Sequence, residues 1–130
     1  MPTRVSAVLF AKRLSTLSEF YQSVFDGRVL HTDADHVVME ISGFNLIVHQ
    51  IPQHLAVAVA VVSPPERREQ GAIRLDYPVM DLNESSRQAA SLGGVIDGHP
   101  PSWAGSETDF FLGHDPEGNV FGVKVLQKSP

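Results

Sequence analysis

The sequence contains no cysteine, which excludes disulfides, thiolate metal sites and cysteine nucleophiles. It also lacks a long hydrophobic run, because the longest, Leu55–Val62, is far too short to span a bilayer. The first residues do not contain the apolar stretch of a signal peptide. Lysine and arginine are not clustered and the net charge is −5, a balance that disfavours nucleic-acid binding. We therefore expect a soluble cytoplasmic protein with no nucleic-acid or membrane partner.

The 130 residues predict a single domain, 1–130, that is long enough to bury a core without staples. Apolar spacings typical of strands and helices recur in the same order in both halves. We expect one helix capped by Ser15 and ended by Gly27, and another capped by Asp81 and ended by Gly93-Gly94. In the first helix the apolar residues at helical spacing are Leu17, Phe20, Tyr21 and Val24. The predicted strands are Val5–Ala11, Arg28–Thr32, His36–Ile41, Asn45–Ile51, Ala72–Val79, Val95–Ile96, Thr108–Gly113 and Asn119–Leu126.

Each half therefore consists of a strand, a helix and three more strands. Module one covers about 1–52 and module two about 71–130, joined by a connection of about 53–70. We interpret the apolar run Leu55–Val62 as a buried part of that connection. A βαβββ unit cannot bury its apolar face alone, so the two units should pair, with the helices on one side of the combined sheet. The predicted fold class is α+β.

Three motifs carry a resemblance to a known superfamily: RLSTLSEFYQSVF in the first helix, YPVMDL followed by SLGG in the second half, and the closing DPEGNVFGV. In the last, Asp115-Pro116 fixes a turn and Gly118 can adopt positive φ before the final strand. On these motifs the chain resembles the glyoxalase/bleomycin-resistance/extradiol-dioxygenase superfamily, also called the vicinal oxygen chelate fold. The resemblance implies two βαβββ modules that form a curved mixed sheet around a cup-shaped cavity.

The resemblance also implies where a metal ion would be held. Members that use a metal bind it with His, Gln or Glu from four strands, and these positions fall on Ser6, Ile47, Arg74 and Gly122 here. None is a good ligand for a divalent ion, and Arg74 places a permanent positive charge there. We therefore predict no metal, no cofactor and no stoichiometric divalent ion. A bound ion would instead point to His49, two residues from Ile47.

Alternation along the strands selects the side chains that should face the cavity. Ile73 and Leu75 should face the helices, which leaves Arg74 pointing inward, where its planar fork needs a carboxylate from Asp76 or from a ligand. Trp103 lies in the loop Pro100–Gly105, as a lid or as a packing or dimer contact. The predicted ligand-binding residues are Arg74, His49, Lys124, Phe10, Asp76 and Trp103. His31 and His36 flank a turn and are interpreted as surface residues.

Three functional classes stay open: a metal-free binding protein like the bleomycin-resistance members, an enzyme, and a structural or regulatory partner domain. A mixed apolar and polar concave lining is typical of a small-molecule site. We therefore rank first a domain that binds a small anionic or oxygen-rich molecule. The alternative is a metal-dependent lyase or dioxygenase of the same superfamily with a non-standard site. The resemblance further implies a homodimer, with the modules paired either within or between chains.

Overall fold

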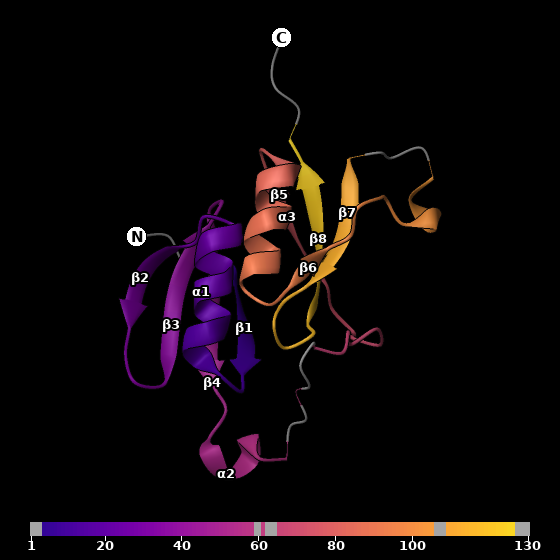
Figure 1. Cartoon of the computed structure of the whole chain (residues 1–130). Coiled ribbons are helices and arrows are strands. Elements are labelled where there is room, and N and C mark those ends of the chain that lie inside the picture. Colours follow the sequence, from indigo (N-terminus) through magenta and orange to yellow (C-terminus); the bar gives the residue numbers. More distant parts are fainter. Residues whose placement is uncertain (1–3, 59–60, 62–64, 106–108, 127–130) are drawn as a thin grey trace.

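The structure, a computed structural model, describes residues 4–58, 61, 65–105 and 109–126. Each half of the chain folds as a strand, a helix and three further strands (Figure 1). The first module contains β1 (Ser6–Ala11), α1 (Leu14–Val24), β2 (Arg28–Thr32), β3 (His36–Ile41) and β4 (Phe44–Gln50). The second contains β5 (Leu75–Val79), α3 (Leu82–Ser91), β6 (Val95–Ile96), β7 (Phe110–His114) and β8 (Val120–Val125). The short helices α2 (Gln53–Ala56) and η1 (Ser102–Ala104) follow β4 and β6 in the chain. The predicted α+β fold with two βαβββ modules is confirmed.

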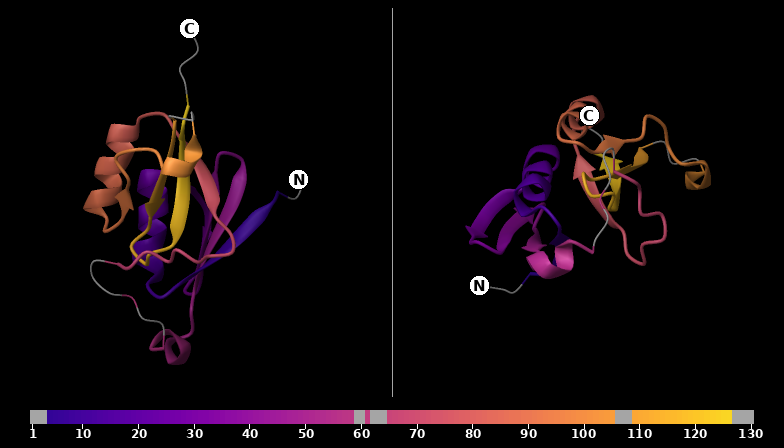
Figure 2. Two further views of the ribbon diagram at one scale, coloured as in Figure 1. Left: turned by 90° about the vertical axis from the view of Figure 1, so that its right-hand side faces the viewer. Right: turned by 60° about the horizontal axis from the view of Figure 1, so that its bottom comes forward.

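Hydrogen bonding divides these strands into two four-stranded mixed sheets, one in each module. Their strand orders are β1-β4-β3-β2 and β5-β8-β7-β6. The pairs β1–β4 and β5–β8 are parallel, and the other neighbours are antiparallel. Thus β1 and β5 are edge strands. Pro78 of β5 is tolerated there because proline has no N–H to donate and an edge strand has one side without a partner. The modules lie side by side, with α1 next to α3 (Figure 2).

A single apolar core joins the two modules. The predicted inward face of α1, namely Leu17, Phe20, Tyr21 and Val24, is buried. Phe25, just after the helix, stacks on Tyr77 of β5 with ring centroids 4.3 Å apart and an interplanar angle of 15°. It also meets Phe121 of β8 edge-on at 5.0 Å. Because each buried aromatic side chain contributes on the order of 2 kcal/mol or more, this cluster is a main source of cohesion between the modules.

The start of α1 differs from the prediction. The helix begins at Leu14, and Arg13 occupies the N-cap without a side-chain hydrogen bond, so Ser15 is not the cap. Instead the Glu117 carboxylate accepts from the backbone N–H groups of Lys12 (2.8 Å to Oε1) and Arg13 (3.0 Å to Oε2). A distant residue of the second module thus satisfies the helix terminus, which spacing along the first half could not reveal.

The other helix ends follow local chemistry more closely. Asp81 caps α3 as predicted, accepting from the Glu84 N–H at 3.1 Å. Gly93 has a φ of 88° just after α3, in agreement with its predicted role. After α1, however, Asp26 rather than Gly27 adopts the left-handed conformation, with a φ of 54°. Aspartate tolerates this region better than most residues because its side chain can bond locally.

The first strand of module two is shorter than predicted. β5 begins at Leu75, whose ladder partner is Phe121, so Arg74 precedes the strand. Ile73 is 82% exposed and does not face a helix. The prediction for Ile73 is wrong because alternation constrains a side chain only where the strand is paired.

The prediction that Leu55–Val62 is a buried part of the connection is wrong for its first residues. Leu55 and Val57 are 53% and 79% exposed, and Ala56 is the buried residue of α2. A helix of four residues offers one small side to the core, so most of its apolar residues stay exposed. The rest of Leu55–Val62 falls partly on 59–60 and 62, outside the described residues. The helices in the described part of the chain are too short or too polar to cross a membrane.

Candidate ligand-binding site

A cavity of about 780 Å³ lies between the edge strands β1 and β5. Its apolar wall includes Leu9 and Leu75, and its charged groups include Arg68, Glu69 and Arg74. This volume is in the range of about 300–1,000 Å³ that small-molecule sites usually have. The unpaired strand edges leave this space open because no ladder joins the two sheets here.

Arg74 stands at the centre of a polar and aromatic cluster on the second module. Its Nε and a terminal nitrogen donate to Asp76 Oδ1 and Oδ2, at 2.7 and 3.1 Å. The guanidinium carbon lies 4.9 Å from the ring centroid of Phe110 and 5.5 Å from that of Trp103. The hydrogen bonds to the Asp76 carboxylate raise the pKa of Arg74 above its usual value, and partial burial opposes this effect. Arg74 therefore keeps its charge, and its orientation is fixed by cation–π contacts and a bidentate ion pair.

Gly122 makes this cluster possible. It pairs with Asp76 across the β5–β8 ladder. A Cβ atom at this position would overlap Asp76 Oδ1 and would lie 2.7 Å from Cε2 of Phe110. Any larger residue would displace the carboxylate that holds Arg74.

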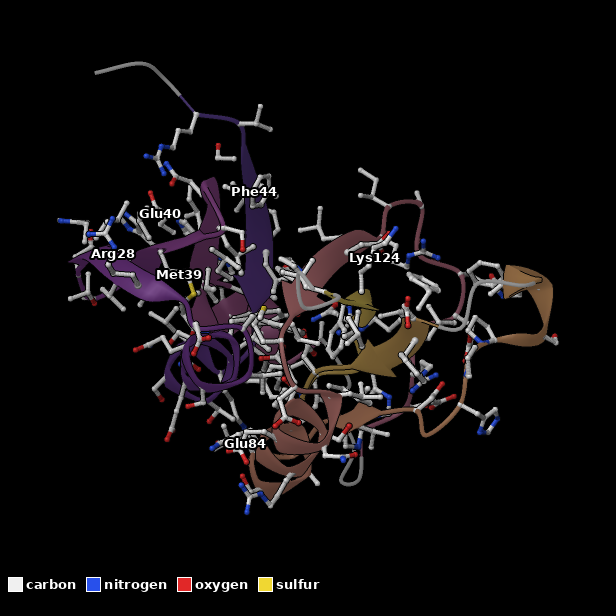
Figure 3. All side chains as sticks on the ribbon, turned by 90° about the horizontal axis from the view of Figure 1, so that it is seen from above. Arg28, Met39, Glu40, Phe44, Glu84 and Lys124 are labelled. Atoms are coloured by element: carbon white, nitrogen blue, oxygen red, sulfur yellow. The ribbon has the colours of Figure 1, made fainter. Side chains whose placement is uncertain are left out.

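Lys124 lies on the same face of the second sheet as Asp76. Its ladder partners are Pro78 and Phe110, and alternation places it with Gly122 and opposite the buried Val123. In Figure 3, Lys124 points away from α3, whereas Met39 of the first sheet lies on the α1 side. Lys124 is exposed and does not line the cavity.

Phe10 and His49 form a separate contact on the first sheet. They are ladder partners, and their ring centroids are 5.9 Å apart. His49 Nδ1 lies 3.0 Å from the Gln50 carbonyl oxygen. Neither residue lines the cavity. The structure thus brings Arg74, Asp76 and Trp103 together, but it does not bring Phe10 and His49 to them.

The positions at which the resemblance places metal ligands do not fit a divalent ion. Ser6 and Arg74 line the cavity, but they offer only a hydroxyl and a guanidinium. Ile47 and Gly122 have no donor side chain. The carboxylate beside Gly122, that of Asp76, is already bound to Arg74. These residues therefore do not form a site for the superfamily's usual metal.

Tyr21, one of the apolar residues of the predicted first helix, also contributes to the cavity. It lines the cavity, and its hydroxyl donates to Asp115 Oδ2 at 2.8 Å. Burial, followed by the charge of Asp115, raises the pKa of Tyr21 well above its usual value, so the phenol stays protonated. Burial also raises the pKa of Asp115, although hydrogen bonds from Asn119 and Tyr21 oppose this. The helical spacing of Tyr21 predicted its burial but could not reveal a partner 94 residues away.

Comparisons with known proteins agree with this architecture. The profile of the glyoxalase-like domain family matches residues 6–124. The fold is similar to that of the fosfomycin resistance protein FosX from Listeria monocytogenes, with a TM-score of 0.68 at 12% identity over 98% of this chain and 93% of that chain. A mutant of FosX, solved with Mn(II) and 1S,2S-dihydroxypropylphosphonic acid, gives a TM-score of 0.67 at 12% identity, covering 97% of this chain and 90% of that chain.

An integron cassette protein from V. cholerae gives a TM-score of 0.60 at 19% identity, covering 98% of this chain and 97% of that chain. No curated protein matches the sequence. At these identities the structural likenesses establish the fold alone.

Proposed function

Because the chain belongs to the glyoxalase-like domain family, we propose that it binds a small anionic or oxygen-rich molecule between β1 and β5. The observation that carries this proposal is the charged, oriented guanidinium of Arg74 in the wall of a cavity of about 780 Å³. A concave site with apolar walls and a few fixed polar groups is the usual form of a small-molecule site.

The chemistry of the cavity wall favours an anion with a carbon skeleton. Asp76 uses two of the five N–H donors of the Arg74 guanidinium, so the remaining donors are available to ligand oxygens. Arg68 brings a second positive charge and Glu69 a negative one to the same wall, while Asp76 balances part of the charge of Arg74. Leu9 and Leu75 would contact the apolar part of the ligand.

The structural neighbours support an oxyanion as the first ligand to test. FosX has been solved with a dihydroxypropylphosphonic acid and, in another crystal, with sulfate. A molecule that carries both hydroxyl and anionic groups could bond to Arg74 and also to the Asp76 carboxylate that holds it. We therefore propose that such molecules bind more tightly than simple anions.

A thermal-shift experiment tests the proposal. The probes are 1S,2S-dihydroxypropylphosphonic acid and 1,2-propanediol, which has the diol but no phosphonate. We expect the phosphonic acid to raise the Tm of the parent protein, since a ligand at 100 times its Kd stabilises the folded state by about 2.7 kcal/mol. The diol should have a much smaller effect. Failure of the phosphonic acid to stabilise the parent would contradict the proposal.

Variants assign the contact. Arg74→Leu should remain folded and lose the stabilisation, and Arg74→Lys should lose most of it because lysine cannot reproduce the bidentate fork. Arg87→Leu is the matched control, since Arg87 is an exposed arginine on α3 that pairs with Glu84 and does not line the cavity. If Arg74→Leu responds to the ligand as strongly as Arg87→Leu does, Arg74 is not the contact.

A further inference from the structure

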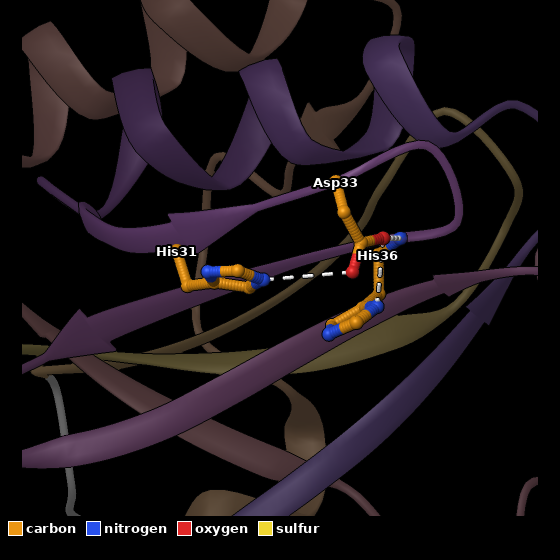
Figure 4. A group of neighbouring side chains, drawn as sticks. All are labelled: His31, Asp33 and His36. Carbon is orange, nitrogen blue, oxygen red and sulfur yellow. Dashed lines mark hydrogen bonds and ion pairs between the residues drawn. The ribbon is translucent and has the colours of Figure 1, made fainter.

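The β2–β3 hairpin brings together three side chains that the cavity does not use. His31, Asp33 and His36 lie at its turn, on the side of the sheet that faces away from α1 (Figure 4). His31 Nε2 lies 3.5 Å from Asp33 Oδ2, and His36 Nδ1 lies 3.0 Å from Asp33 Oδ1. One ligand atom from each residue lies within 4.8 Å of the other two. Two imidazoles and a carboxylate therefore converge on one small volume.

An irregularity in the strand pairing creates this convergence. Val29 pairs with Met39, but the register then shifts so that His31 pairs with Val38. Without the shift, His31 would pair with the buried Val37 and face α1. The extra residue turns His31 to the same face as His36, and such bulges commonly re-aim a side chain at a functional site.

Backbone hydrogen bonds hold the carboxylate in place. Asp33 Oδ1 accepts from the N–H groups of Asp35 (2.8 Å) and His36 (3.0 Å). The Asp33 N–H donates to the His36 carbonyl oxygen at 3.0 Å, and the Gln50 N–H of β4 donates to that of Asp35 at 2.7 Å. The turn uses Oδ1, which leaves Oδ2, the atom nearest His31, for another partner.

A third histidine supports the cluster. His49 is the ladder partner of His36, and their rings are stacked with centroids 5.9 Å apart and an interplanar angle of 9°. Three of the chain's six histidines thus lie together on this face. The stacking limits the rotation of the His36 ring, and restricted ligand orientation is a feature of built metal sites.

We propose that His31, Asp33 and His36 bind one divalent transition-metal ion. In a tetrahedral site with bonds of about 2.1 Å, ligand atoms lie about 3.4 Å apart, whereas here one ligand atom from each residue lies within 4.8 Å of the other two. His31 and Asp33, which are exposed, can make the remaining adjustment by small rotations. Two imidazoles and one carboxylate favour Zn²⁺, Co²⁺, Ni²⁺ or Cu²⁺ over Mg²⁺ and Ca²⁺. Because three ligands do not complete the coordination shell, the ion could also accept water or a ligand oxygen from solvent.

This site is separate from the cavity between β1 and β5, since none of its three residues lines that cavity. It also shares no residue with Ser6, Ile47, Arg74 and Gly122. The proposal departs from the expectation, drawn from those four positions, that the protein carries no divalent ion. It does not depend on the proposed small-molecule function.

Calorimetric titration tests the site on the 130-residue chain made without an affinity tag and freed of metal with a chelator, which is then removed. We expect Zn²⁺ to bind at one ion per chain and Mg²⁺ to give no signal. His31→Ala and Asp33→Asn should each weaken Zn²⁺ binding about tenfold or more. Asparagine keeps an oxygen that can accept the turn's N–H groups, so this variant separates metal binding from hairpin structure. His99→Ala removes an exposed histidine elsewhere and should bind as the parent does.

Substitution with Co²⁺ supplies a second measurement. Visible absorption bands of a low-symmetry nitrogen- and oxygen-ligated ion are expected in the parent and in His99→Ala, and should be lost in His31→Ala. Absence of Zn²⁺ binding to the parent would overturn the proposal. So would equal affinity of the parent, His31→Ala and Asp33→Asn, because the ion would then be bound elsewhere.

Discussion

Replacement of Glu117 by alanine should destabilise the protein by roughly 3 kcal/mol. The carboxylate accepts from two backbone N–H groups at the start of α1, at 2.8 and 3.0 Å, and is 6% exposed. Hydrogen bonds to a charged group contribute about 1.5–3 kcal/mol each, and the negative charge also lies favourably at a helix N-terminus. We take the lower value for each bond because Arg13 is exposed and water can reach the vacated space.

Glu117→Gln should cost less, about 1–2 kcal/mol, because its amide keeps one acceptor oxygen for one of the two N–H groups. The turn should persist in both variants, since the Glu117 backbone N–H still donates to Asp115 Oδ1. Urea denaturation at pH 7 measures the free energy of unfolding. For a domain of this size, 3 kcal/mol corresponds to a decrease in Tm of about 10 °C.

Glu19→Ala is the matched control, because Glu19 is an exposed glutamate on α1. Its effect should stay within about 0.5 kcal/mol. If Glu117→Ala is as mild as this control, the N–H groups of Lys12 and Arg13 find other partners and the reasoning is refuted. In Glu117→Ala, a weaker circular-dichroism signal of helix with an unchanged signal of strand would show that α1 is the element destabilised, as expected.

Two further predictions follow from the site's surroundings. His114 Nδ1 accepts from Arg67 Nε at 2.9 Å, and burial and then the Arg67 charge lower the pKa of His114 from 6.5. The unfolded chain therefore takes up this proton first, so the free energy of unfolding should fall as the pH decreases below about 6.5. In urea titrations between pH 7.5 and 5.5, His114→Asn should show a smaller fall than the parent protein. A fall as large as that of the parent would contradict this role of His114. We also propose a homodimer, because the large apolar side chains of Phe10, Ile73 and Trp103 are 62%, 82% and 63% exposed and exposed apolar surface is typical of protein interfaces. Light scattering should give twice the 14.2 kDa mass of one chain, and a mass of 14.2 kDa would refute the proposal.

Much of the fold could be predicted from local sequence patterns. The bounds of β2, β3 and β6 agree with the prediction residue for residue. Alternation was informative in β3, where Val37, Met39 and Ile41 are buried and the residues between them are partly exposed. The prediction failed where a distant residue decides the local structure. The start of α1 depends on Glu117, and the start of β5 depends on where its pairing with β8 begins.

The site was predictable in part, for the same reason. Sequence spacing identified Arg74 and offered Asp76 as its partner, two residues along the chain. The contact of Arg74 with Phe110 requires the fold of the second sheet, because Phe110 lies on β7. The bulge that re-aims His31 is also a property of pairing, so HTDADH at 31–36 gave no indication from spacing alone that its histidines would converge.

The closing motif DPEGNVFGV has a wider role than that of a turn before the last strand. The Asp115 carboxylate accepts from the hydroxyl of Tyr21, and the Glu117 carboxylate accepts from the N–H groups of Lys12 and Arg13 at the start of α1. The two carboxylates of this motif therefore bond to the first module. Gly122, from the same motif, leaves room for Asp76 to hold Arg74. One short segment thus fixes the placement of the modules that enclose the cavity and the orientation of its principal cation. The superfamily resemblance places a metal ligand at Gly122. Here the space beside Gly122 holds the Asp76 carboxylate, which is already bound to the Arg74 guanidinium. This arrangement favours recognition of a ligand by hydrogen bonds and charge over coordination to a metal at this position.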